Sequence, residues 1–120
     1  MSDARQRLGR QGESLAAQAL VQRGYEIADR NWRCQIGEVD IVARHGDVWA
    51  FFEVRTRRGR GFGTPEESVT AAKRQRMMDV AQAYLAEHEL ADVDCRLGVA
   101  AVEMDAAGRL VRIELYDSIT

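Results

Sequence analysis

Two carboxylates in the first half of the chain have the type and spacing to bind a metal ion together. Asp40 and Glu53 lie in two segments of alternating residues, and Gly46-Asp47 between them is a typical two-residue hairpin turn. Pairing outward from that turn places Asp40 directly opposite Glu53. Side chains in directly opposite positions have Cβ atoms roughly 4.5–5.5 Å apart. The sequence therefore predicts two acids side by side on one face of a hairpin.

Such a pair needs compensation. At about 5 Å and an effective dielectric constant near 20, two like charges repel by about 3 kcal/mol. A shared proton, a neighbouring arginine or a divalent cation would relieve this repulsion. Arg55 is predicted on the same face, opposite Glu38. An ordinary ion-pair patch and a metal site therefore both remain open at this point.

The hairpin positions these side chains because strand residues alternate between two faces. One face is wholly apolar and is expected in a core, and the other carries the acids. The apolar face is Val39, Ile41, Ala43, Val48, Ala50, Phe52 and Val54, and the other is Glu38, Asp40, Val42, Trp49, Phe51, Glu53 and Arg55.

Helices and further strands surround the hairpin in the order α-β-β-β-α-β-β. We expect a helix over 2–23 ended by Gly24, a strand over 25–33, and the hairpin over 37–58. A second helix, capped by Thr70, should reach Glu87, before strands at 94–104 and 110–116. This order predicts one α/β domain over 1–120, with a mixed sheet flanked by helices. The strand after the second helix should run parallel to a strand of the first group.

Basic residues gather on and beside the hairpin, although the whole chain has a net charge of −2. The segment 55–66 combines four arginines with three glycines and the only proline, which predicts a loop. It is either a phosphate-contacting loop, through Arg57, Arg58 and Arg60, or a solvated turn. Lys73 lies near a helix N-terminus, where positive charge opposes the helix dipole, and this weakly favours a functional role.

The composition disfavours membrane-spanning, secreted and zinc-binding proteins. No apolar run approaches the ~18 residues of a membrane-spanning helix, and no signal-peptide pattern is visible, so we expect a cytoplasmic location away from membranes. Cys34 and Cys95 are far apart and form no zinc signature, which favours two free thiols.

Several separated motifs resemble the YraN-type family of small uncharacterised bacterial proteins. They are Gly37-Glu38-Val39-Asp40-Ile41-Val42-Ala43, Phe52-Glu53-Val54-Arg55-Thr56-Arg57, Gly12-Glu13 with Ala16 and Ala17, and Phe62-Gly63 with Pro65-Glu66-Glu67 before Lys73. The resemblance covers roughly positions 9 to 104. That family in turn resembles archaeal Holliday-junction resolvases and the restriction-endonuclease-like PD-(D/E)XK nuclease superfamily.

The resemblance implies a restriction-endonuclease-like sandwich and a site for Mg²⁺ or Mn²⁺ formed by Glu13, Asp40 and Glu53. The role of Glu13 rests on the resemblance alone, since a glutamate on a helix surface is ordinarily just solvated. In the superfamily the E-x-K element ends in a lysine. Here that element begins at Glu53, and its lysine is replaced by Arg55, which cannot deprotonate but can hold an oxyanion. Lys73 joins Asp40, Glu53 and Arg55 as a candidate catalytic residue.

Two hypotheses follow. The first is a metal-dependent nuclease acting on branched or structured DNA, with Arg55, Lys73 and the Arg57–Arg60 loop gripping the backbone. The second is a binding module of the same fold, in contact with DNA or RNA, whose cleavage is weak or lost. A role in protein interaction without nucleic acid is a more distant third, and a homodimer remains open.

Overall fold

The computed structural model describes residues 2–58 and 69–119. Its elements follow the predicted order α-β-β-β-α-β-β. They are α1 (Ser2–Gln22), β1 (Glu26–Arg33), β2 (Glu38–His45), β3 (Val48–Arg58), α2 (Ala71–Glu87), β4 (Asp94–Met104) and β5 (Leu110–Tyr116). Thr70 caps α2 as expected, because its Oγ1 accepts a hydrogen bond from the amide of Lys73 at 3.1 Å.

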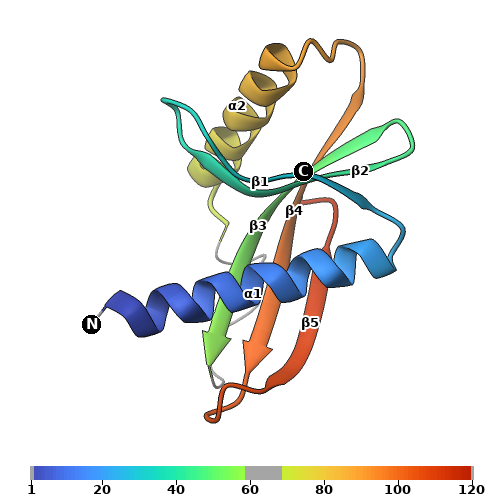
Figure 1. The fold of residues 1–120 in the computed structure, drawn as a ribbon. Coiled ribbons are helices and arrows are strands. Elements are labelled where there is room, and N and C mark those ends of the chain that lie inside the picture. Colours follow the sequence, from blue (N-terminus) through green and yellow to red (C-terminus); the bar gives the residue numbers. More distant parts are fainter. Residues whose placement is uncertain (1, 59–68, 120) are drawn as a thin grey trace.

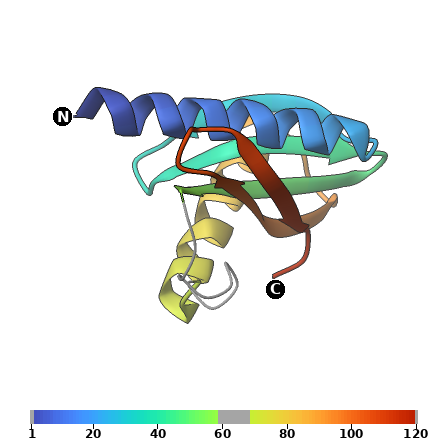
Figure 2. The same ribbon diagram turned by 90° about the horizontal axis from the view of Figure 1, so that it is seen from below.

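The strands form a five-stranded mixed sheet in the order β1-β2-β3-β4-β5. All neighbours are antiparallel except β3 and β4, which pair in parallel across the α2 crossover. Helix α1 lies across one face of the sheet and α2 covers the other (Figures 1 and 2). The predicted α/β class, element order and parallel pairing are therefore confirmed. In the described part of the chain, neither helix is long and apolar enough to cross a membrane.

Each face of the sheet has its own core. The α1-side cluster contains Ala16, Ala17, Leu20, Ile41, Ala43, Ala50, Phe52, Ala100, Val102 and Met104. The α2-side cluster contains Val39, Val42, Phe51, Val80, Ala81, Tyr84, Leu85 and Leu97. Cys34 and Cys95 are free thiols packed beside the second cluster, as expected. Because β2 and β3 contribute to both clusters, they are held firmly at the centre of the molecule.

Strand β1 changes faces in its last third. Arg30 donates a hydrogen bond to Ser14 of α1, whereas the indole N–H of Trp32 donates to Glu87 of α2. On a regular strand these two side chains would share a face. Asn31 between them has φ 53°, a left-handed conformation that asparagine tolerates better than most residues. This local twist sends Trp32 to the α2 side.

Strand β2 changes faces at the same level. Ile41 belongs to the α1-side cluster, but Val39 packs with Val42 in the α2-side cluster. The prediction that Val39 shares the face of Ile41 is therefore wrong. Val39 pairs with Trp32, so it follows the twist in β1. Asp40 lies at the crossover between the two faces.

Two other predictions need correction. Arg55 to Arg58 belong to β3 and pair with Ala101 to Met104, so the predicted loop at 55–66 does not include them. The remaining part of that segment, with Arg60 and Phe62, lies outside the described residues. The alternation of residues 110–116 predicts that Val111 faces inward together with Ile113 and Leu115, but Val111 is 54% exposed. It lies at a register shift opposite Glu103 and Met104, which leaves it without a pairing partner and turns it outward.

Candidate functional site

Asp40 lies where the ladder between β2 and β3 ends. The predicted hairpin register is confirmed from His45↔Val48 to Ile41↔Phe52. The next step would pair Asp40 with Glu53, but the strands are no longer paired there. Instead, Asp40 Oδ2 accepts a hydrogen bond from the backbone amide of Val54 at 2.7 Å. The side chain thus replaces a ladder bond and is held between the two strands.

The surroundings of Asp40 disfavour its charge. Burial is the largest cause that raises its pKa, and the pKa reaches about 6 against an ordinary 3.8. The hydrogen bond from Val54 acts in the opposite direction, while the carboxylates of Glu13, Glu53 and Glu38 raise the pKa further. Four acidic side chains from α1, β2 and β3 therefore interact at one place.

Glu13 reaches this place because α1 packs closely on β3. A β-carbon at Gly12 would overlap Oγ1 of Thr56, so only glycine permits the observed approach. Glycines inside a helix cost roughly 1 kcal/mol each relative to alanine, so Gly9 and Gly12 predict either a late helix start or a close approach by another backbone. The helix begins at Ser2, and the close approach is found at Gly12, although the sequence does not name Thr56 as the partner. The side chain of Glu13 is 18% exposed, and its carboxylate lies 3.9 Å from the guanidinium of Arg30. Glu13 is thus an interacting neighbour of Asp40 and more than a solvated surface residue.

Glu53 is held by two cations. Its Oε1 lies 2.6 Å from Nζ of Lys73, and its Oε2 lies 3.5 Å from Nε of Arg55. The second contact is electrostatic only, since both buried atoms lack a hydrogen-bond partner within the described residues. The predicted pairing of Arg55 with Glu38 is wrong, because Glu38 instead binds Arg33 at 3.1 Å. The β2–β3 ladder ends before that position, and Arg55 therefore turns to Glu53 on its own strand.

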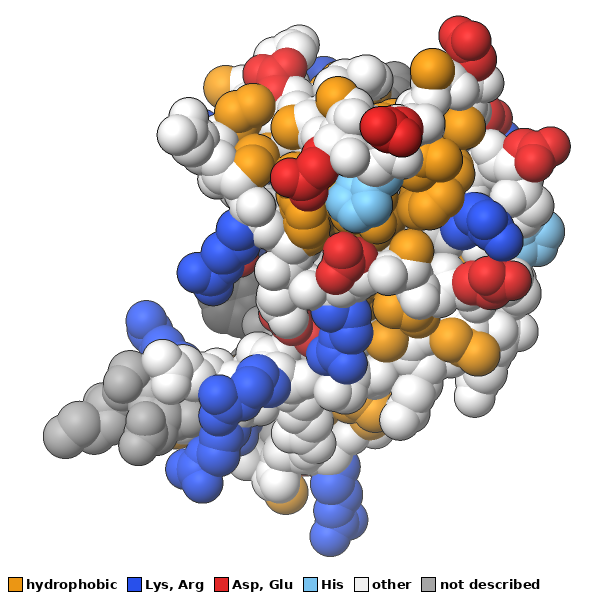
Figure 3. Space-filling model, turned by 45° about the horizontal axis from the view of Figure 1, so that its top comes forward, with side chains coloured by type: hydrophobic (Ala, Val, Ile, Leu, Met, Phe, Trp, Pro, Cys, Tyr) orange, Lys and Arg blue, Asp and Glu red, His pale blue; other side chains and the backbone are white. Residues whose placement is uncertain are grey.

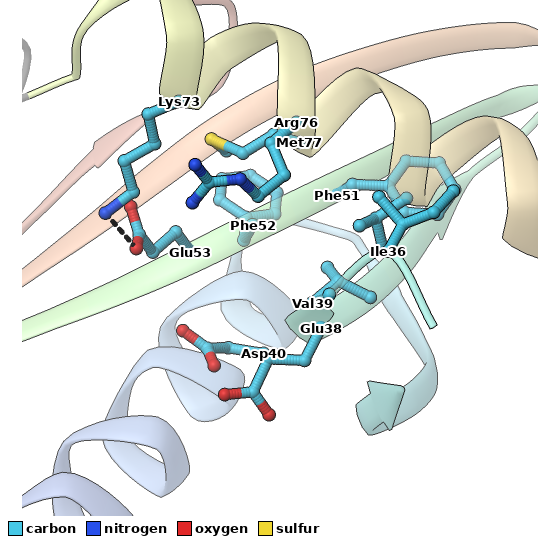
Figure 4. Close-up of a pocket in the computed structure, with 12 residues that line it drawn as sticks. Ile36, Glu38, Val39, Asp40, Phe51, Phe52, Glu53, Lys73, Arg76 and Met77 are labelled. Atoms are coloured by element: carbon cyan, nitrogen blue, oxygen red, sulfur yellow. Dashed lines mark ion pairs between the residues drawn. The ribbon is translucent and has the colours of Figure 1, made fainter. Parts of the chain in front are cut away.

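A pocket of about 460 Å³ opens between α2, the start of β2 and the middle of β3. It is lined by Ile36, Gly37, Glu38, Val39, Asp40, Phe51, Phe52, Glu53, Lys73, Arg76, Met77 and Val80. Figure 4 shows Lys73 and Arg76 reaching in from α2, with Glu53 beside them and the carboxylates of Glu38 and Asp40 at the end nearer α1. On the surface, Lys and Arg side chains lie on both sides of a hollow between the α2 and α1 parts of the molecule (Figure 3).

Of the residues that line this pocket, only Asp40, Glu53 and Lys73 were in the predicted site. Arg76 and Met77 follow Lys73 by three and four positions, the spacing that places helical residues on one face. That spacing was a usable signal once Lys73 had been selected. Arg57 and Arg58, in contrast, do not line the pocket; they lie at the far end of β3, and Arg58 is exposed.

A family model described as "Uncharacterised protein family UPF0102" matches residues 12–102, which include Glu13, Glu38, Asp40 and Glu53. The chain belongs to this family. A UPF0102 protein of Roseiflexus castenholzii is 49% identical over 95% of the chain and 93% of its own length. Those of Moorella thermoacetica and Nocardia farcinica are 45% and 49% identical, over 96% and 89% of the chain and 96% and 84% of their own lengths. The resemblance to the YraN-type family is thereby confirmed.

The acids of this UPF0102 chain meet some requirements of a site for Mg²⁺ or Mn²⁺. Carboxylate oxygens are the ligands that these hard cations prefer, and Glu53 Oε2 is a buried oxygen without a hydrogen-bond donor. No three His, Cys, Asp or Glu side chains are close enough to hold a metal ion among residues 2–58 and 69–119. By the type of their donor atoms, Asp40 and Glu53 fit as ligands, and Glu13 is a further carboxylate that interacts with Asp40.

Proposed function

We propose that this protein is a Mg²⁺- or Mn²⁺-dependent nuclease that hydrolyses phosphodiester bonds in branched or otherwise structured DNA. The observation that carries the proposal is the convergence of Glu13, Asp40 and Glu53 beside Lys73. Four different elements bring these side chains together, and the raised pKa of Asp40 means that its surroundings destabilise the charged carboxylate. The resemblance of the motifs to PD-(D/E)XK nucleases supports the same conclusion.

Each side chain has a role in this proposal. Asp40 and Glu53 would hold the cation, with Glu13 contributing directly or through a water. A divalent cation bound there would lower the pKa of a coordinated water and neutralise charge on the phosphate. Lys73 lies at the pocket and provides positive charge for the substrate backbone. Arg55 has its Nε buried against Glu53, which suits a residue that orients this carboxylate.

A second candidate function is a nucleic-acid-binding module without cleavage. One observation favours it: both oxygens of Glu53 already face cations, Lys73 at 2.6 Å and Arg55 at 3.5 Å. A carboxylate neutralised in this way could serve the fold alone. In that case the Lys and Arg side chains around the hollow between the α1 and α2 parts of the molecule would bind DNA or RNA, and the acids would bind no metal.

Cleavage of a panel of labelled DNA structures with Mn²⁺ separates the two functions. The panel contains single strands, duplexes, flaps and four-way junctions. Wild-type protein should cleave at least one of them, and Asp40→Asn should not. Asp47→Asn is the matched control, because Asp47 is an exposed aspartate in the turn that follows the opposite end of β2. If wild type binds the panel yet leaves every structure intact, the binding module is the correct function.

A further inference from the structure

The pocket beside Glu53 is larger and more apolar than a cation and a phosphate require. Its volume of about 460 Å³ lies within the roughly 300–1,000 Å³ typical of sites that enclose an organic ligand. Half of the residues that line it are apolar: Ile36 and Met77, which are at least partly exposed, and the buried core residues Val39, Phe51, Phe52 and Val80. A hydrated ion or a phosphate gains nothing from such walls. The pocket therefore fits a ligand that has a flat or apolar part next to a charged one.

We propose that the pocket binds an unpaired nucleotide of the substrate strand. This inference rests on the proposed function, which puts a backbone phosphate beside Asp40 and Glu53. A continuous duplex presents charged backbone and polar groove edges, while its base faces are covered by stacking. An unpaired base exposes both faces and enters a pocket without being extracted from a stack. The substrate class is then nucleic acid with at least one unpaired residue next to the scissile bond.

Ile36 provides a surface for the base. It is 50% exposed, although it is a large apolar side chain, and it belongs to neither core cluster. It lies in the turn between β1 and β2, where the amide of Cys34 donates to the carbonyl of Gly37 at 2.9 Å. The turn holds Ile36 at the edge of the pocket. A base packed there would remove this apolar surface from water.

Arg76 provides the polar contact. It lies one helical turn after Lys73, is exposed, and has no ion pair or hydrogen bond to the described residues. Its side chain lies beside Gly37, since a β-carbon there would be in ordinary van der Waals contact with Cδ of Arg76, at 3.8 Å. Figure 4 shows its guanidinium directed into the pocket near Lys73. A planar guanidinium can stack on a base or contact a phosphate in two places, and Lys73 already binds Glu53.

Fluorescence anisotropy with two labelled probes tests this inference. One probe is a blunt DNA duplex, and the other has the same sequence with one additional unpaired thymidine. Titrations in EDTA and in Ca²⁺ should show about tenfold tighter binding to the probe with the unpaired residue, the order expected for one packed base. Ile36→Ala and Arg76→Gln should each remove most of this preference. Equal affinity of wild type for both probes in both conditions would overturn the inference.

Matched variants control for general loss of apolar surface or charge. Val111→Ala removes a similarly exposed apolar side chain on β5. Arg23→Gln removes an exposed arginine that directly follows α1, and neither residue lines the pocket. Both should keep the preference, and its loss in either control would also count against the pocket.

Cleavage of the same probes with Mn²⁺ separates this inference from the proposed function. Preferential binding without any cleavage would support the pocket and contradict the nuclease. Equal cleavage of both probes, unchanged in Ile36→Ala, would support the nuclease and contradict the pocket.

Discussion

Replacing Asp40 with asparagine should stabilise the folded chain at neutral pH. The pKa of Asp40 is raised from 3.8 to about 6, mainly by burial and then by the neighbouring carboxylates. One pKa unit corresponds to about 1.4 kcal/mol, so the ionised side chain destabilises the fold by about 3 kcal/mol at most, before screening by water is considered. Asparagine carries no charge, and its oxygen can still accept the hydrogen bond from Val54.

The gain should depend on pH in a defined direction. A carboxyl whose folded pKa is raised binds its proton more tightly in the folded state, so wild-type stability falls as the pH rises from 3.8 to about 6. Above that range the whole penalty is present, and below it the penalty is absent. The difference in stability between Asp40→Asn and wild type should therefore be largest at neutral pH and small near pH 3.8.

Urea denaturation in EDTA, followed by circular dichroism at several pH values, measures this difference. EDTA removes divalent cations, which would otherwise stabilise the wild type selectively. Asp47→Asn is the matched control and should show no such pH-dependent gain, because Asp47 is exposed. If Asp40→Asn is less stable than wild type at neutral pH, or if its gain is the same at every pH, the electrostatic account of Asp40 is wrong.

Three further outcomes are expected. Mn²⁺ should raise the melting temperature of wild type saturably in differential scanning fluorimetry, and Asp40→Asn or Glu53→Gln should each lose most of this rise. If the melting temperatures of both variants rise as much as that of wild type, the metal binds elsewhere. Arg55→Lys should raise Mn²⁺-dependent cleavage, because a lysine is restored at the E-x-K position, and a lower rate would identify Arg55 as an adapted catalytic residue. Gly12→Ala should lower the free energy of unfolding by about 1–3 kcal/mol through overlap with Thr56, whereas Gly9→Ala, with nothing within 4 Å, should stabilise by about 1 kcal/mol.

The sequence was sufficient for features that depend on local signals. The Gly46-Asp47 turn and the alternation of β2 and β3 determined the hairpin register. The start of α2 followed from Thr70, and its length followed from the helical spacing of Met77, Val80, Ala81, Tyr84 and Leu85. The parallel pairing of β3 and β4 followed from the length of the crossover between them. Each of these signals lies within a few residues or follows a general rule of chain connection.

The contacts within the site were not predictable in the same way. Lys73 reaches Glu53 only because the crossover returns the start of α2 to the middle of β3. Glu13 reaches Asp40 only because Gly12 packs on Thr56, a contact between residues far apart in the chain. The change of faces at Val39 depends on one left-handed residue, Asn31, which the alternating pattern does not reveal.

Asp40 and Glu53 differ in a way that bears on function. Glu53 faces two cations, as a carboxylate in a structural ion-pair cluster would. Asp40 has no ion pair among the described residues, and burial together with three acids opposes its charge. An arrangement selected for stability alone would neutralise the carboxylate whose charge is most disfavoured. Since Arg30 and Arg33 bind Glu13 and Glu38 instead, the uncompensated charge stays on Asp40, the residue that a divalent cation would stabilise most.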